Sequence, residues 1–107
     1  MAPQLAKSLV PLALIYAAHS DAAFRNGIQA KAVAESACEL SEWKLVPALD
    51  ALAAACAELQ DFPNAVRWQE RAIALAPANQ TAELRSRLQR YLARQPYRMA
   101  PPAPTAP

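Results

Sequence analysis

The chain has 107 residues, which is enough for one small domain. Its net charge of +2 is too small to indicate nucleic-acid binding by itself, and no alternating run of β-branched and aromatic residues predicts a sheet. Hydrophobic residues make up 54% of the chain, Ala is the most frequent residue, and Gly occurs once. Because Ala loses the least on entering a helix, this composition predicts an all-α fold.

The first predicted helix covers residues 5–18, after a short arm. Its apolar run follows Lys7 and has the length of a signal-peptide core, so export by this segment is an alternative to a cytoplasmic location. We prefer the helix, because the positive flank is weak and Pro11 interrupts the run. Ser8 could cap a shorter version with Pro11 in its first turn. The run is too short to span a membrane, which takes about 20 apolar residues.

The second predicted helix covers residues 28–40 and follows a polar connection in which Asn26 and Gly27 form a turn signal. A short link with Trp43 comes next. The apolar positions of this helix follow a 3.6-residue period: Ala30, Val33, Ala34, Ala37, Cys38 and Leu40.

Residues 46–77 predict two short helices joined by a tight turn at residues 60–62. Pro47 is a favourable first residue for the third helix, which covers residues 47–59. The fourth covers residues 63–76 and stops before Pro77. The apolar faces of this pair contain Leu49, Leu52, Ala53 and Cys56 on the third helix and Ala65, Ala72 and Leu75 on the fourth.

The fifth predicted helix covers residues 80–94, with Asn79 as its cap and Pro96 beyond its end. Its apolar stripe contains Leu84, Leu88, Tyr91 and Leu92. Residues 96–107 are rich in Pro and Ala and predict an extended tail of low complexity.

An internal repeat supports this division, since ESACEL at residues 35–40 matches ERAIAL at residues 70–75. The spacing of small and large apolar residues in the second unit resembles a tetratricopeptide repeat (TPR), a helix-turn-helix unit of about 34 residues. The matching positions are Leu49, Leu52, Ala65, Ala72 and Pro77. The departures are Cys56 in place of Tyr, Ala53 and Gln60 in place of Gly, and Gln69 in place of a large apolar residue.

The resemblance implies a helical domain over residues 1–95 followed by the tail. Repeat 1 covers about residues 8–42 with a long internal loop, repeat 2 covers residues 46–77, and a capping helix covers residues 80–94. The whole is similar to the closing segment of many bacterial TPR proteins, in which Pro-Tyr-Arg, here residues 96–98, follows the capping helix.

The family resemblance implies a solenoid scaffold that binds proteins, because a repeat cannot bury its apolar face alone. We therefore expect a non-enzymatic interaction module, an accessory subunit or adaptor of a larger assembly. By the resemblance, the binding groove is lined by Pro47, Asp50, Ala54, Ala57 and Glu58. This groove would be shallow and mildly negative, which suits a peptide or helix with small apolar and basic residues. It lacks the Lys, Arg and Asn that carboxylate-binding TPR clamps use.

Charge is unevenly distributed along the chain. Residues 35–61 carry a balance of −5 and residues 79–98 a balance of +4. A solvated helix face is one interpretation of the basic end. The alternative function is a binder of nucleic acid or an anionic surface through a basic face of Arg87, Arg90, Arg94 and Arg98.

The sequence predicts no catalytic set, no metal site and no cofactor. His19 is the only histidine and is expected to be solvated or to lie at a helix end. Cys38 and Cys56 are expected to be buried free thiols, with a disulfide left as the alternative. Trp43 and Trp68 are expected to pack at helix junctions, with a role as binding anchors as the alternative.

Overall fold

The computed structural model describes residues 3–100, which form five α-helices and two single-turn 3₁₀ helices. Within this range there is no strand, so the prediction of an all-α fold is confirmed. The α-helices are α1 (Pro3–Ala18), α2 (Gly27–Leu40), α3 (Val46–Glu58), α4 (Phe62–Leu75) and α5 (Thr81–Leu92). The 3₁₀ helices are η1 (Ala22–Phe24) and η2 (Ala78–Gln80).

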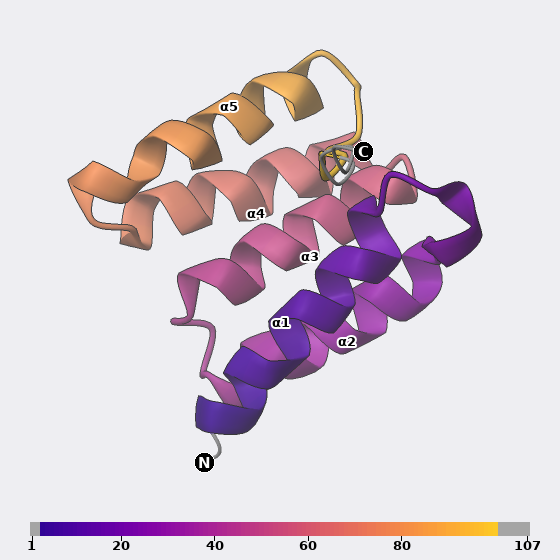
Figure 1. The fold of residues 1–107 in the computed structure, drawn as a ribbon. Helices are drawn as coiled ribbons and strands as arrows, with labels where there is room; N and C mark the ends of the chain where they lie inside the picture. The colour runs from indigo at the N-terminus through magenta and orange to yellow at the C-terminus, as the bar shows by residue number, and fades with distance from the viewer. Residues whose placement is uncertain (1–2, 101–107) are drawn as a thin grey trace, which may run out of the picture.

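The helices form two hairpins and a covering helix, as the sequence predicts. The α1–α2 hairpin and the α3–α4 hairpin stack, with α3 packed against both helices of the first hairpin, and α5 packs on α4 (Figure 1). The stack therefore runs from the first hairpin at one end to α5 at the other.

The core is centred on α3, in which every residue from Ala48 to Ala57 is buried. Its predicted apolar face is inside, but so is the rest of the helix, because α1, α2 and α4 surround it. A helix that is apolar on all sides is expected to be enclosed in this way. Its alanines keep neighbouring helices close, since the distance between packed helices depends on the side chains at their contact.

Short polar side chains start two of the helices. The Oδ1 atom of Asn26 accepts a hydrogen bond from the backbone N–H of Gln29 at 3.1 Å, and Asp61 caps α4 through the N–H of Asn64. The Asn26–Gly27 pair is therefore a helix start, and its interpretation as a turn is wrong. A Cβ atom at Gly27 would lie 2.8 Å from Cδ2 of Leu59, so a larger residue there would displace the Leu59 side chain.

Three helices end in a left-handed residue that is not glycine. Glu42, Gln60 and Arg94 have φ angles of 57°, 64° and 60°. In each case the next N–H bonds back across the last turn to a carbonyl, for example from Gln95 to Arg90 O at 2.8 Å after α5. This is the Schellman motif.

The structure corrects several predicted helix ends. Pro96 does not end α5, because the helix already stops at Leu92. Asn79 lies inside η2 and caps nothing, since α5 begins without a side-chain cap. Ser8 is inside α1, where its hydroxyl donates to Gln4 O at 2.9 Å, and Pro11 is tolerated within the same helix.

In the described part of the chain, every helix is too short or too polar to cross a membrane. The last residues of the predicted Pro-rich tail, 101–107, lie outside the described range.

Candidate interaction surface

A buried polar cluster joins α3, α4 and α5. Asp50 is 5% exposed and Gln69 is fully buried. The Nε2 atom of Gln69 donates to Oδ1 of Asp50 at 3.0 Å and to the carbonyl oxygen of Leu84 at 3.0 Å. Gln69 therefore connects α3, α4 and α5. It stands at a position where the resembled family has a large apolar residue.

Arg87 of α5 completes this cluster. Its Nη1 atom donates to Oδ2 of Asp50, and its Nη2 atom donates to the hydroxyl of Tyr97 at 3.2 Å. The guanidinium also lies 4.1 Å from the centre of the Tyr97 ring, within cation–π range. Burial raises the pKa of the Asp50 carboxyl, while Arg87 and Gln69 oppose that shift. Arg87 is thus a packed residue, and its side chain is only 18% exposed.

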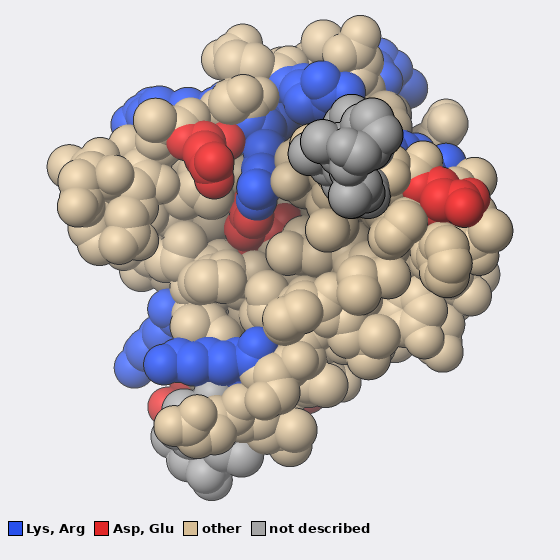
Figure 2. Space-filling model, viewed as in Figure 1, with Lys and Arg blue, Asp and Glu red and all other residues tan. Residues whose placement is uncertain are grey.

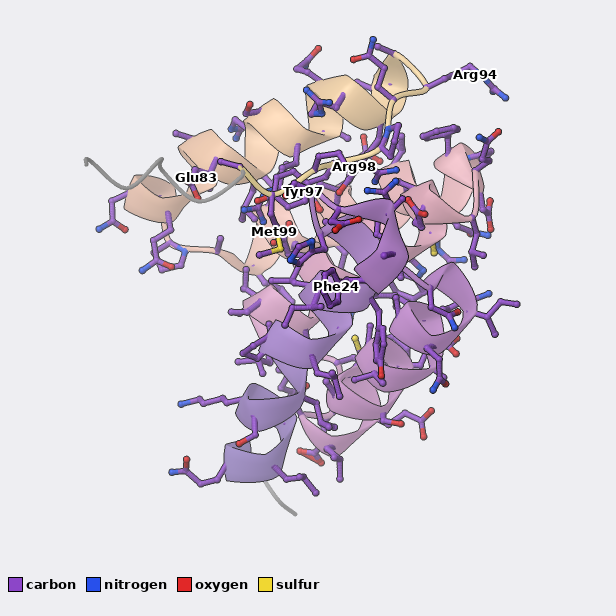
Figure 3. All side chains as sticks on the ribbon, turned by 45° about the vertical axis from the view of Figure 1, so that its right-hand side comes forward. Phe24, Glu83, Arg94, Tyr97, Arg98 and Met99 are labelled. Carbon is purple, nitrogen blue, oxygen red and sulfur yellow. The ribbon has the colours of Figure 1, made fainter. Side chains whose placement is uncertain are left out.

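The chain after α5 turns back across the helices (Figure 3). Residues 96–99 are half-buried, whereas Gln95 is exposed. Two backbone contacts fix the path: Nε of Arg90 donates to Pro96 O at 3.1 Å, and the N–H of Met99 donates to Ala18 O at 2.7 Å. The segment therefore links α5 to the C-terminal end of α1.

Glu58, at the end of α3, lies between Arg25 of the α1–α2 loop and Arg98 after α5. Its Oε1 atom is 2.7 Å from Nη2 of Arg98, and its Oε2 atom is 3.4 Å from Nε of Arg25. Arg25 also donates to the carbonyl oxygen of His19 at 2.7 Å. Glu58 therefore connects the C-terminal segment to the loop between α1 and α2.

The predicted groove is largely covered by the chain itself. Asp50, Ala54 and Ala57 are 5%, 2% and 1% exposed, and Pro47 alone among the five predicted groove residues is exposed. Tyr97 and Met99 pack against an alanine cluster that consists of Ala17, Ala18, Ala30, Ala54 and Ala55. Tyr97 and Met99 therefore fill the predicted groove beside Ala54 and Ala55 of α3.

Sequence reasoning missed Tyr97, Met99, Arg25 and Gln69 as members of this surface. The sequence predicts that Tyr97 and Met99 belong to an extended tail, whereas both pack against the helices. The available signals were the Pro-Tyr-Arg sequence after the last helix and the polar Gln69 at an apolar repeat position.

The predicted basic face divides into two parts. Arg87 and Arg98 form ion pairs with Asp50 and Glu58, so these two arginines of the predicted basic face are engaged within the chain. Arg90 and Arg94 are exposed, and the Arg94 guanidinium lies 5.5 Å from the centre of the Phe62 ring at the start of α4. In Figure 2, Lys and Arg follow the edge over α5, while uncharged residues cover most of the surface below it.

An open cleft of about 410 Å³ remains beside the covered end, between the start of α3 and the start of α5. Pro47 lies on its wall, Asp50 and Arg87 lie inside it, and the Glu83 side chain at its rim is 88% exposed. The cleft is lined by Val46, Pro47, Asp50, Asn79, Gln80, Ala82, Glu83, Leu84 and Arg87.

A second uncovered feature is the outer side of α1. Leu5, Leu12 and Ile15 are 50%, 40% and 37% exposed. Their spacing of seven and three residues places them on one side of the helix.

The remaining candidate residues are structural. Cys38 and Cys56 are buried free thiols, as predicted, and burial raises their pKa values to about 12 and about 11. Trp43 stacks on Trp68 with ring centres 5.1 Å apart, which confirms a junction between the α2–α3 link and α4. Nδ1 of His19 accepts from the N–H of Asp21 at 2.9 Å.

Within residues 3–100, His, Cys, Asp and Glu do not gather in threes at a spacing that could hold a metal ion. Comparison of the chain with protein-family models, with curated proteins and with solved structures gave no match.

Proposed function

We propose that this chain is a non-enzymatic protein-binding module of the TPR type, which serves as a small accessory subunit or adaptor. The observation that carries the proposal is the uncovered apolar side of α1, formed by Leu5, Leu12 and Ile15. A row of large apolar side chains on one helix face is typical of a surface that another protein covers.

The packing inside the chain indicates which kind of partner would fit the outer side of α1. The α1–α2 hairpin already accepts α3, an Ala-rich helix, on one of its sides. Stacked helical hairpins bury their apolar faces against their neighbours. The partner we propose is therefore a helix or helical hairpin of another protein with an apolar face of small residues.

The alternative, a binder of nucleic acid or an anionic surface, has weaker support. Asp50 and Glu58 neutralise two of the four arginines of the predicted basic face. Arg85, Arg90 and Arg94 remain exposed on or just after α5.

The test is recovery of a partner from the native extract with three tagged chains. The first is unmodified, the second carries Leu5→Gln, Leu12→Gln and Ile15→Gln, and the third carries Arg85→Gln, Arg90→Gln and Arg94→Gln. Gln is chosen because it retains helix propensity. Nuclease treatment and high salt separate protein contacts from phosphate contacts, which weaken steeply with salt.

We expect a stoichiometric protein that persists at high salt with the first and third chains and is lost with the second. Recovery that survives the α1 substitutions but disappears with the arginine substitutions, nuclease or salt would overturn the proposal in favour of the anion binder.

A further inference from the structure

We propose that the C-terminal ends of α1 and α3, together with Arg87, form a binding site for an extended peptide with the pattern Tyr-Arg-apolar. Residues 96–99 occupy this site within the chain, and a partner peptide of the same pattern displaces them. This inference rests on the proposed protein-binding function, since it names the ligand class of a second surface of the same module.

The first argument is that residues 96–99 are held as a bound peptide is held. The backbone contacts lie at both ends of the segment, at Pro96 O and at the Met99 N–H. The side chains between them each have their own partner. Extended peptides are commonly recognised in this way, with main-chain hydrogen bonds supplying affinity and side-chain contacts supplying specificity.

The second argument is the chemical match at each position. The Tyr97 ring has the Arg87 guanidinium over it, and the Tyr97 hydroxyl accepts from the same side chain. Arg98 faces the Glu58 carboxylate. Met99 packs on the alanine cluster, whose small side chains leave room for a large one. An aromatic, a cationic and an apolar residue in sequence are therefore each recognised.

The third argument is that the segment can leave. It is joined to α5 through Arg94, which has a left-handed φ of 60°, and through the exposed Gln95. The residues it contacts have other partners that hold them in its absence: Arg87 bonds to Asp50, which Gln69 anchors, and Arg25 contacts Glu58. A short tether supplies an effective concentration on the order of millimolar, which is the level that a competing peptide has to overcome.

The test uses full-length chains and a fluorescently labelled peptide, Gln-Pro-Tyr-Arg-Met-Ala, which reproduces residues 95–100. A released chain carries Tyr97→Ala and Arg98→Ala. The matched control carries Arg85→Ala and Leu92→Ala, which also remove one arginine and one large apolar residue but lie exposed on α5. Fluorescence anisotropy measures binding, and circular dichroism checks that each chain keeps its helices.

We expect the released chain to bind the peptide at least tenfold more tightly than the unmodified chain and the control. Adding Glu58→Arg to the released chain should weaken binding at least tenfold. A peptide with Glu in place of Arg should then bind that triple variant more tightly than the original peptide does. A folded released chain that binds no better than the control would overturn the proposal.

If the variants do not fold, hydrogen exchange on the unmodified chain provides a second test. The Met99 amide should be protected, because it donates to Ala18 O, and excess unlabelled peptide should increase its exchange rate. An unprotected Met99 amide, or a protected one that peptide does not affect, would overturn it. Neither readout involves the outer side of α1, so failure here is distinguishable from failure of the proposed function.

Discussion

Nη1 of Arg87 on α5 donates a hydrogen bond to Oδ2 of Asp50 on α3, 37 residues earlier in the chain. The contact joins the basic end of the sequence to its acidic middle. A second ion pair, between Arg98 after α5 and Glu58 at the end of α3, joins the same two regions. The uneven charge of the sequence is therefore partly neutralised within the molecule. The amount of arginine free to meet an outside partner is smaller than composition suggests.

The Arg87–Asp50 pair should be important for stability. Replacing Arg87 by Met leaves the 5%-exposed carboxyl of Asp50 without its cation. The expected loss is about 3 kcal/mol in the free energy of unfolding, because an unpaired buried charge is costly. Urea unfolding measures this loss.

The matched experiment is a double-mutant cycle with Asp50→Asn. The double variant should be clearly more stable than Arg87→Met alone, since it buries no unpaired charge. Additive losses from the two single substitutions would show that the pair does not act as a unit.

The left-handed helix end at Gln60 offers a stabilising substitution. Gln60 has a φ of 64°, a conformation that costs an L-residue with a Cβ more than it costs glycine. Gln60→Gly should raise the free energy of unfolding by roughly 0.5–1 kcal/mol, which thermal unfolding resolves as a shift of several degrees.

Ala32→Gly is the control for this substitution, because Ala32 is an exposed residue in the interior of α2. It should lower stability by about 1 kcal/mol. Destabilisation by both glycines would contradict the left-handed geometry at Gln60.

A methyl group at Gly27 should displace the Leu59 side chain. A Cβ there would lie 2.8 Å from Cδ2 and 3.0 Å from Cγ of Leu59, and 3.2 Å from Cγ of Glu58. Gly27→Ala should therefore destabilise the chain by about 1–2 kcal/mol, as overpacking does, despite the better helix propensity of Ala. Thermal unfolding is the measurement.

Leu59→Ala provides the complementary change, since Leu59 is 40% exposed and its removal makes space. In that background, Gly27→Ala should cost less than in the unmodified chain. An equal cost in both backgrounds would mean that Leu59 is not the obstacle.

The buried thiols should make the fold sensitive to alkaline pH. Burial raises the pKa of Cys56 to about 11, whereas an unfolded thiol titrates near 8.5, so the folded chain binds more protons between these values. Stability contributed by this group is complete below about pH 8.5 and is lost as the pH rises toward 11.

Urea unfolding at pH 8 and pH 10.5 measures this loss, which should reach about 2 kcal/mol for Cys56. Cys56→Ala removes the group and should reduce the pH dependence by that amount. An unchanged pH dependence in Cys56→Ala would show that other groups, such as the buried Tyr91 hydroxyl, are responsible.

The sequence alone determined the helices and their order. Ala content and the 3.6-residue period depend only on neighbours along the chain, so they predicted the core positions Ala30, Ala34, Ala37 and Cys38 of α2 correctly. Helix ends were less predictable, because α5 stops through a backbone motif at Arg94 and not at a proline.

Only the tertiary structure decided which polar residues meet. A helical period gives the direction of a side chain on its own helix, but it does not say which residue of another helix lies opposite. Asp50, Gln69 and Arg87 come together because α3, α4 and α5 stack, and Tyr97 joins them because the chain turns back after α5. These contacts span long separations in sequence, and their geometry follows from the packing of whole helices.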